Sequence, residues 1–178
     1  MRLGFLSAAV LILGLAGCGS IMEEEVSTCP AASILGDAAD VTVFRAGPGR
    51  DLPDVHYHAQ LTNLATRCDF GRTRGTNYAY GRLNFDVEVA LGSAAYPAPV
   101  DVRYFVAVID STSQRILTRE VFSVHAPLSS EHRSITVADH IGRVAIPIEA
   151  RVDGGNYELV IGFELTPEQV AFNRTRSR

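Results

Sequence analysis

Apolar and polar residues alternate with a period of two along much of the chain from residue 41 onward. The two clearest segments, 83–91 and 157–165, place Leu, Phe, Val, Tyr and Ile at alternate positions, with mostly polar residues between them. A third segment, 55–62, alternates apolar residues with two histidines, a glutamine and a threonine. This alternation is typical of strands that bury one face and expose the other.

The remaining candidate strands complete an all-β pattern. Residues 102–109 are almost continuously apolar, which is typical of a strand covered on both faces. Weaker candidates are 41–45, 115–124, 133–138 and 143–149. Pro147 favours an edge or a non-bonded position for the last of these. About eight short strands without helices between them predict a single antiparallel β-sandwich, immunoglobulin-like in general arrangement, over residues 37–165.

Only the end of the chain has a helical signal. Thr166 is followed by Pro167 and, three positions on, by Gln169, which is a capping-box arrangement. Leu165 and Val170 can add the hydrophobic contact that often accompanies such a start. We therefore expect residues 166–178 to form a short helix and an Arg-rich tail.

The amino-terminal residues have the pattern of an export signal. Met1 and Arg2 give a short positive start, and residues 3–17 then carry no charge. Spanning a bilayer core takes about 20 apolar residues, so this run is too short to be a transmembrane helix. Its length suits the apolar region of a secretory signal, and we expect residues 1–17 to be a signal peptide.

The end of this apolar run indicates lipidation. Leu15-Ala16-Gly17-Cys18 resembles the bacterial lipobox. The resemblance implies diacylglyceryl transfer to the Cys18 sulfur, cleavage after Gly17 and a third acyl chain on the new amino terminus; two or more chains anchor a protein stably. Gly19 in place of Asp favours the outer membrane over the inner membrane. The alternative is an ordinary secreted protein with a chance cysteine at this position.

Residues 18–36 are expected to form the lipidated cysteine and a tether, which Glu23, Glu24 and Glu25 would keep solvated. The other two cysteines, Cys29 and Cys68, would lie in an oxidising compartment and therefore predict a disulfide. The alternative is two reduced, buried thiols. Three cysteines exclude both a four-cysteine zinc site and a disulfide-dense miniprotein.

Length and charge narrow the function classes. The 178 residues suffice for one domain of ordinary size. A net charge of −4 gives no general attraction for nucleic acid, so no nucleic-acid partner is expected. Arginines gather in 71–75 and in the tail 174–178; solvated loop charge is the simpler interpretation, and contact with anionic head groups is the alternative.

His56 and His58 are the best metal candidates. At positions i and i+2 of a strand both imidazoles leave the same face, and Asp54 shares their parity. The simpler interpretation is the wet polar face of an amphipathic strand, because no further ligand lies nearby in the sequence. We therefore expect no metal and no other cofactor.

Enzymatic signals are weak as well. The chain has no G-x-S-x-G element, and its cysteines are already assigned to the lipid and the disulfide. The segment 47–50 lacks the Lys and Ser/Thr of a phosphate-binding loop. The sequence therefore predicts a protein that is not an enzyme.

Several segments together resemble a group of small alphaproteobacterial lipoproteins. They are the lipobox, Cys29-Pro30, the turn region 44–51, the strand 104–108 and the ending GGNYELVIGFELTPEQVAFNR. The resemblance implies no activity and no functional residues. We predict a non-enzymatic envelope lipoprotein, on the periplasmic face of the outer membrane, that docks onto an as yet unidentified envelope protein. The alternative is a binding module for a metal or small ligand centred on His56 and His58.

Overall fold

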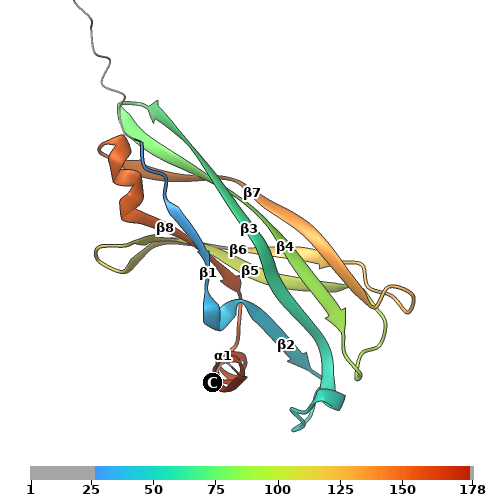
Figure 1. Ribbon diagram of the computed structural model, residues 1–178. Coiled ribbons are helices and arrows are strands. Elements are labelled where there is room, and N and C mark those ends of the chain that lie inside the picture. Colours follow the sequence, from blue (N-terminus) through green and yellow to red (C-terminus); the bar gives the residue numbers. More distant parts are fainter. Residues whose placement is uncertain (1–26, 177–178) are drawn as a thin grey trace, which may run out of the picture.

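The computed structural model describes residues 27–176, which fold into two facing sheets of four strands each (Figure 1). The strands are β1 (Ala31–Ile34), β2 (Asp40–Phe44), β3 (Val55–Thr73), β4 (Thr76–Leu91), β5 (Val100–Asp110), β6 (Arg115–Ala126), β7 (Ser134–Ile148) and β8 (Tyr157–Phe163). Three 3-10 helices, η1 (Gly36–Ala38), η2 (Leu52–Asp54) and η3 (Arg151–Asn156), and one α-helix, α1 (Pro167–Arg176), connect or follow them. The predicted all-β sandwich with a short C-terminal helix is confirmed.

The strand order leaves two free edges on each side of the sandwich. One sheet has the order β1-β8-β5-β6 and the other β2-β3-β4-β7. All neighbouring strands are antiparallel except β1 and β8. Thus β1 and β2 are the edge strands on one side, and β6 and β7 are the edge strands on the other. Pro147 lies on β7, so its predicted edge position is confirmed.

The period-two pattern builds the core between the sheets. On β4 the residues Leu83, Phe85, Val87 and Val89 are all buried. They face apolar residues of the other sheet in one hydrophobic cluster, which includes Leu159, Ile161 and Phe163 of β8. The positions between them on β4 are exposed or half-buried, as expected for one buried face.

The β3–β4 hairpin is longer than its hydrophobic pattern predicts. The two strands stay paired from Tyr57 and Leu91 to a two-residue turn at Arg74 and Gly75. Both turn residues have positive φ, 50° and 88°, as a type I′ turn requires. The ladder shifts register near Asn63, which itself has a φ of 53°.

The first strand lies inside the segment predicted to be a tether. Residues Ala31–Ile34 form β1, which pairs in parallel with β8, so the sandwich begins earlier than residue 37. The physical reason is that β1 supplies only four residues to an existing sheet edge, and so short a strand leaves little alternating pattern to detect.

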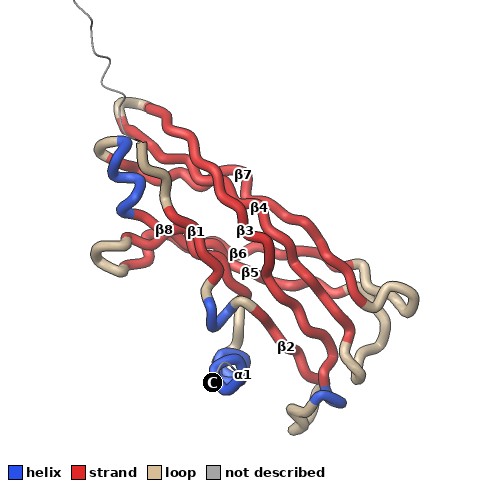
Figure 2. Tube along the Cα trace, in the orientation of Figure 1, coloured by secondary structure: helices blue, strands red, loops and turns tan. Residues whose placement is uncertain are grey.

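Helix α1 packs against η1 and β2, on the β1–β2 side of the sandwich (Figure 2). Its capping box is confirmed: the Thr166 backbone N–H donates to Gln169 Oε1 over 2.8 Å, and the Gln169 N–H donates to Thr166 Oγ1 over 3.3 Å. The buried Asn173 side chain donates to the carbonyl oxygens of Asp37 and Asp40, at 3.0 and 2.8 Å. These bonds hold the helix against η1 and the start of β2.

Two arginines of the predicted tail also belong to this contact. Arg174 pairs with Asp37 at 2.6 Å, and Arg176 lies 3.7 Å from Asp40. Their charge is therefore partly neutralised by acids of the sandwich.

Candidate functional site

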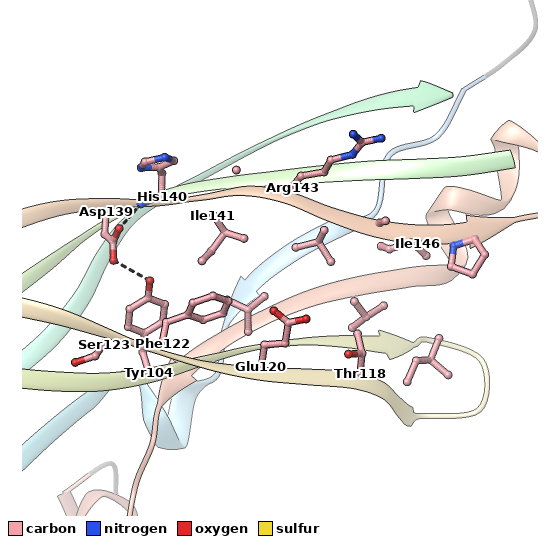
Figure 3. Close-up of a pocket in the computed structure, with 17 residues that line it drawn as sticks. Tyr104, Thr118, Glu120, Phe122, Ser123, Asp139, His140, Ile141, Arg143 and Ile146 are labelled. Carbon is pink, nitrogen blue, oxygen red and sulfur yellow. Dashed lines mark hydrogen bonds between the residues drawn. The ribbon is translucent and has the colours of Figure 1, made fainter. Parts of the chain in front are cut away.

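The β6–β7 side of the sandwich carries a groove of about 1000 Å³, which we call the β6–β7 groove. Figure 3 shows β6 and β7 as its two walls. Side chains of β5 form its floor, among them Val106 and Val108.

The groove exists because the core is covered unevenly on this side. Thr118, Glu120 and Phe122 are spaced two apart on β6 and all line the groove. Thr118 and Glu120 are exposed, because the facing sheet does not cover them. On β7, the buried Ile141 and Ile146 line the opposite wall. The groove therefore gives access to apolar side chains that are continuous with the core.

Tyr104 and Asp139 bound one end of the groove. The Tyr104 hydroxyl donates a 2.7 Å hydrogen bond to Asp139 Oδ2 (Figure 3). The Tyr104 ring packs edge-to-face on Phe85 and stacks on Phe122, with centroid distances of 5.2 and 5.5 Å. Burial, reinforced by the Asp139 carboxylate, raises the pKa of the Tyr104 hydroxyl. The hydroxyl therefore stays protonated and donates to Asp139, whose other carboxylate oxygen accepts the His140 backbone N–H over 2.8 Å.

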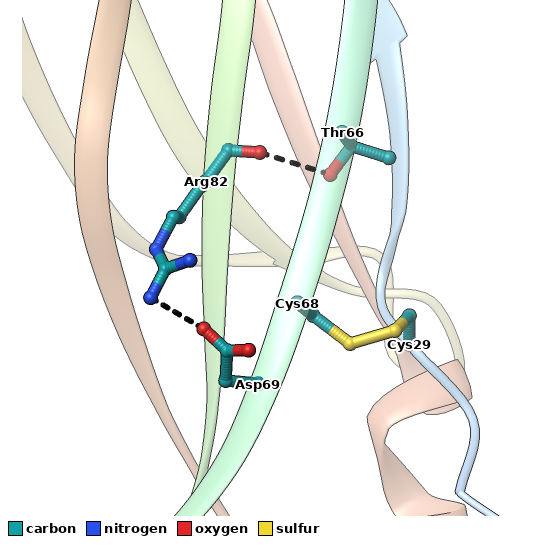
Figure 4. The surroundings of a disulfide bond; sticks show 5 residues. All are labelled: Cys29, Thr66, Cys68, Asp69 and Arg82. Atoms are coloured by element: carbon teal, nitrogen blue, oxygen red, sulfur yellow. Dashed lines mark hydrogen bonds and ion pairs between the residues drawn. A yellow bond between two sulfur atoms is a disulfide. The ribbon is translucent and has the colours of Figure 1, made fainter.

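The predicted disulfide is present. Cys29 and Cys68 are bonded, with their Cα atoms 5.9 Å apart (Figure 4). Cys29 lies two residues before β1 of one sheet and Cys68 lies on β3 of the other, so the bond links the two sheets. Beside it, Asp69 of β3 pairs with Arg82 of β4 at 2.5 Å. This region is a structural link, not a redox site of the CxxC kind.

The two candidate histidines lie on β3, but the structure does not gather a ligand set around them. His58 Nδ1 lies 3.1 Å from Thr42 Oγ1, and burial lowers the pKa of His58. Asp54 is buried and pairs with Arg45 at 2.6 Å. Within residues 27–176, no group of three or more His, Cys, Asp or Glu side chains could hold a metal ion.

The expected lipidation site, Cys18, lies outside the described residues, as do the signal peptide and most of the tether. Between residues 27 and 176, no helix is both long enough and apolar enough to cross a membrane.

The β6–β7 groove, and Glu120 that lines it, were not predicted from the sequence. One signal could have indicated it. Phe122, Val124 and Ala126 define the core-facing parity of β6, and Glu120 continues that parity with a charge. A carboxylate at a core-facing position is unusual unless the core is open there.

Comparison of the chain with protein-family models, with curated proteins and with solved structures finds no match.

Proposed function

We propose that this protein is a non-enzymatic, lipid-anchored component of the bacterial cell envelope, on the periplasmic face of the outer membrane, and that its sandwich docks onto another envelope protein. The observation that carries the docking proposal is the β6–β7 groove between two free sheet edges. The pattern Leu15-Ala16-Gly17-Cys18 carries the proposal of the anchor.

Free edges favour docking because their backbone groups lack a neighbouring strand. A partner's extended segment can pair with such an edge and place alternate side chains in a pocket beside it. Within residues 27–176, β6 pairs only with β5 and β7 pairs only with β4. Ile116, Leu117 and Val121 of β6 are 61%, 46% and 39% exposed. A stretch of apolar side chains along a free edge is typical of an interaction surface.

The anchor is tested by substituting Cys18→Ser in the producing bacterium. We expect the variant to lose labelled palmitate and to accumulate as uncleaved precursor, because the modified sulfur is absent. Equal incorporation of palmitate into wild type and variant would contradict the anchor. Membrane fractionation of the wild type tests the outer-membrane assignment.

The docking proposal is tested by affinity capture from native envelopes with a matched pair of variants. Leu117→Asp places a charge in the groove, whereas Val152→Asp places one on η3 at a residue of similar exposure, 53%. We expect wild type and Val152→Asp to recover the same envelope protein and Leu117→Asp to recover at least tenfold less. Equal recovery by all three proteins would contradict docking at the groove.

A further inference from the structure

The β6–β7 groove has an unpaired negative charge inside it. The Glu120 carboxylate points from β6 into the space between the two strands (Figure 3). It makes no hydrogen bond or ion pair with any residue of the described segment 27–176. Asp139 adds a second carboxylate at the end near Tyr104. The groove therefore combines apolar walls with acidic groups.

The neighbouring cations point away from this space. Arg143 of β7 lies over the Tyr80 ring, 3.6 Å from its centroid, and is directed out of the groove in Figure 3. Arg119 pairs with Glu164 and lies 4.4 Å from the centroid of Phe105. Neither arginine neutralises Glu120. A cationic group entering the groove would find a carboxylate that has no competing partner.

The shape of the site suits an extended chain. The residues of β6 from Arg115 to Val121 are all exposed. At about 3.4 Å per residue, this stretch is about 24 Å long. A strand added along it would pair with the free backbone of β6 and direct every second side chain toward Ile141 and Ile146 of β7.

We propose that the β6–β7 groove binds an extended segment of a partner protein, with apolar side chains at alternate positions and one Lys or Arg among them beside Glu120. This inference rests on the proposed docking function and specifies the chemistry of the partner. The basic side chain supplies charge complementarity, the apolar side chains cover the open core, and the backbone pairs with β6.

Two other occupants fit less well. A small cationic amphiphile could fill the apolar volume and pair with Glu120, but it would leave the backbone groups of β6 unpaired. A second copy of β6, added antiparallel about the midpoint of Arg115–Ala126, would place the apolar Val121 opposite Glu120, so that no cation would lie directly opposite the carboxylate.

The test uses the full chain in lipid nanodiscs and synthetic peptides of about nine residues, enough to cover the exposed stretch Arg115 to Val121 with one residue beyond each end. The probe peptide has Val at every second position, except that the central residue of this series is Lys, and it has Ser or Thr at all other positions. A matched peptide carries Glu in place of Lys. We expect the Lys peptide to bind wild type at least tenfold more tightly than the Glu peptide, and Glu120→Lys to reverse this order. Glu131→Lys, an exposed loop substitution, should leave the order unchanged. Binding of the two peptides that does not depend on residue 120, or no binding at all, would overturn the proposal.

A second measurement separates strand addition from simple apolar binding. Methylating alternate backbone nitrogens of the Lys peptide, on its pairing edge, removes donors but keeps every side chain. We expect this change to weaken binding at least tenfold. Equal binding of the methylated peptide, or binding of dodecylammonium with none of the Lys peptide, would overturn strand addition. If Leu117→Asp still loses the envelope partner when the peptides fail, docking stands and only the proposed partner chemistry is wrong.

Discussion

On the β1–β2 side of the sandwich, a disulfide and η1 connect the two sheets, and α1 packs against η1 and β2. On the β6–β7 side of the described chain, the edge strands diverge around a groove of about 1000 Å³ that no helix covers. Both sides begin with the same problem, because the edges of two packed sheets leave the core accessible between them. In the described chain, the β1–β2 side is covered by these contacts, whereas the β6–β7 side is open.

The difference supports the proposed docking at the β6–β7 side. Covering apolar surface stabilises a fold by about 25 cal/mol per Å², so a closed β6–β7 side would be the more stable arrangement. The structure instead places Glu120, a charged residue, at a core-facing position there. Natural proteins break local rules of this kind mainly at functional sites.

The disulfide should have the largest effect on stability. Its cysteines are separated by 39 positions, and closing a loop of this length stabilises a fold by about 4 kcal/mol in the chain-entropy model. We expect the double variant Cys29→Ala, Cys68→Ala to lose about that much free energy of unfolding in a urea titration. Wild type treated with a reductant serves as the control and should match the variant. Unchanged midpoints in both would show that the β1–β2 side does not depend on this bond.

The helix contact should have the next largest effect. Asn173 is 3% exposed and donates to two backbone carbonyl groups. Asn173→Ala removes both of these hydrogen bonds at a buried position, and we expect a loss of about 2 kcal/mol.

The matched control for Asn173 is Glu168→Ala on the same helix. Glu168 forms an exposed pair with Arg50 at 3.5 Å, and such pairs contribute about 0–1 kcal/mol. Equal losses for both substitutions, measured by urea titration, would contradict the role of Asn173 in closing the β1–β2 side.

Much of the fold could be predicted from local patterns. Alternation identified β4 and β8, Pro147 indicated an edge, and Thr166 and Gln169 located the helix start. The pairing of Cys29 with Cys68 followed from the number of cysteines and the expected compartment. These features are encoded within a few residues or follow from a count.

The rest depends on contacts between distant segments. The part of β3 after Ala65 carries polar residues such as Arg67 and Asp69, so its extension to Thr73 follows from pairing with β4 and not from its own pattern. The β6–β7 groove depends on how far two sheets diverge at strands that lie apart in the sequence. The sequence shows that Glu120 has the core-facing parity of β6. That this position opens into a groove could not be predicted, because it depends on β6 being an edge strand.

The smallest expected effect concerns the hydrogen bond between Tyr104 and Asp139 at the end of the groove. Tyr104→Phe removes the donor, and we expect a loss of about 1 kcal/mol at neutral pH. Since the folded protein raises the pKa of this hydroxyl, its stabilising contribution is complete below the unfolded pKa of about 10. It is lost progressively as the pH rises above 10 toward the folded pKa, because only the unfolded chain releases the proton there.

Urea titrations should therefore show that the difference in free energy of unfolding between wild type and Tyr104→Phe narrows above pH 10. Tyr96→Phe, at a residue that is 86% exposed, should match wild type throughout. A constant difference for Tyr104→Phe across this range would mean that the open side does not hold the Tyr104 proton as the structure indicates.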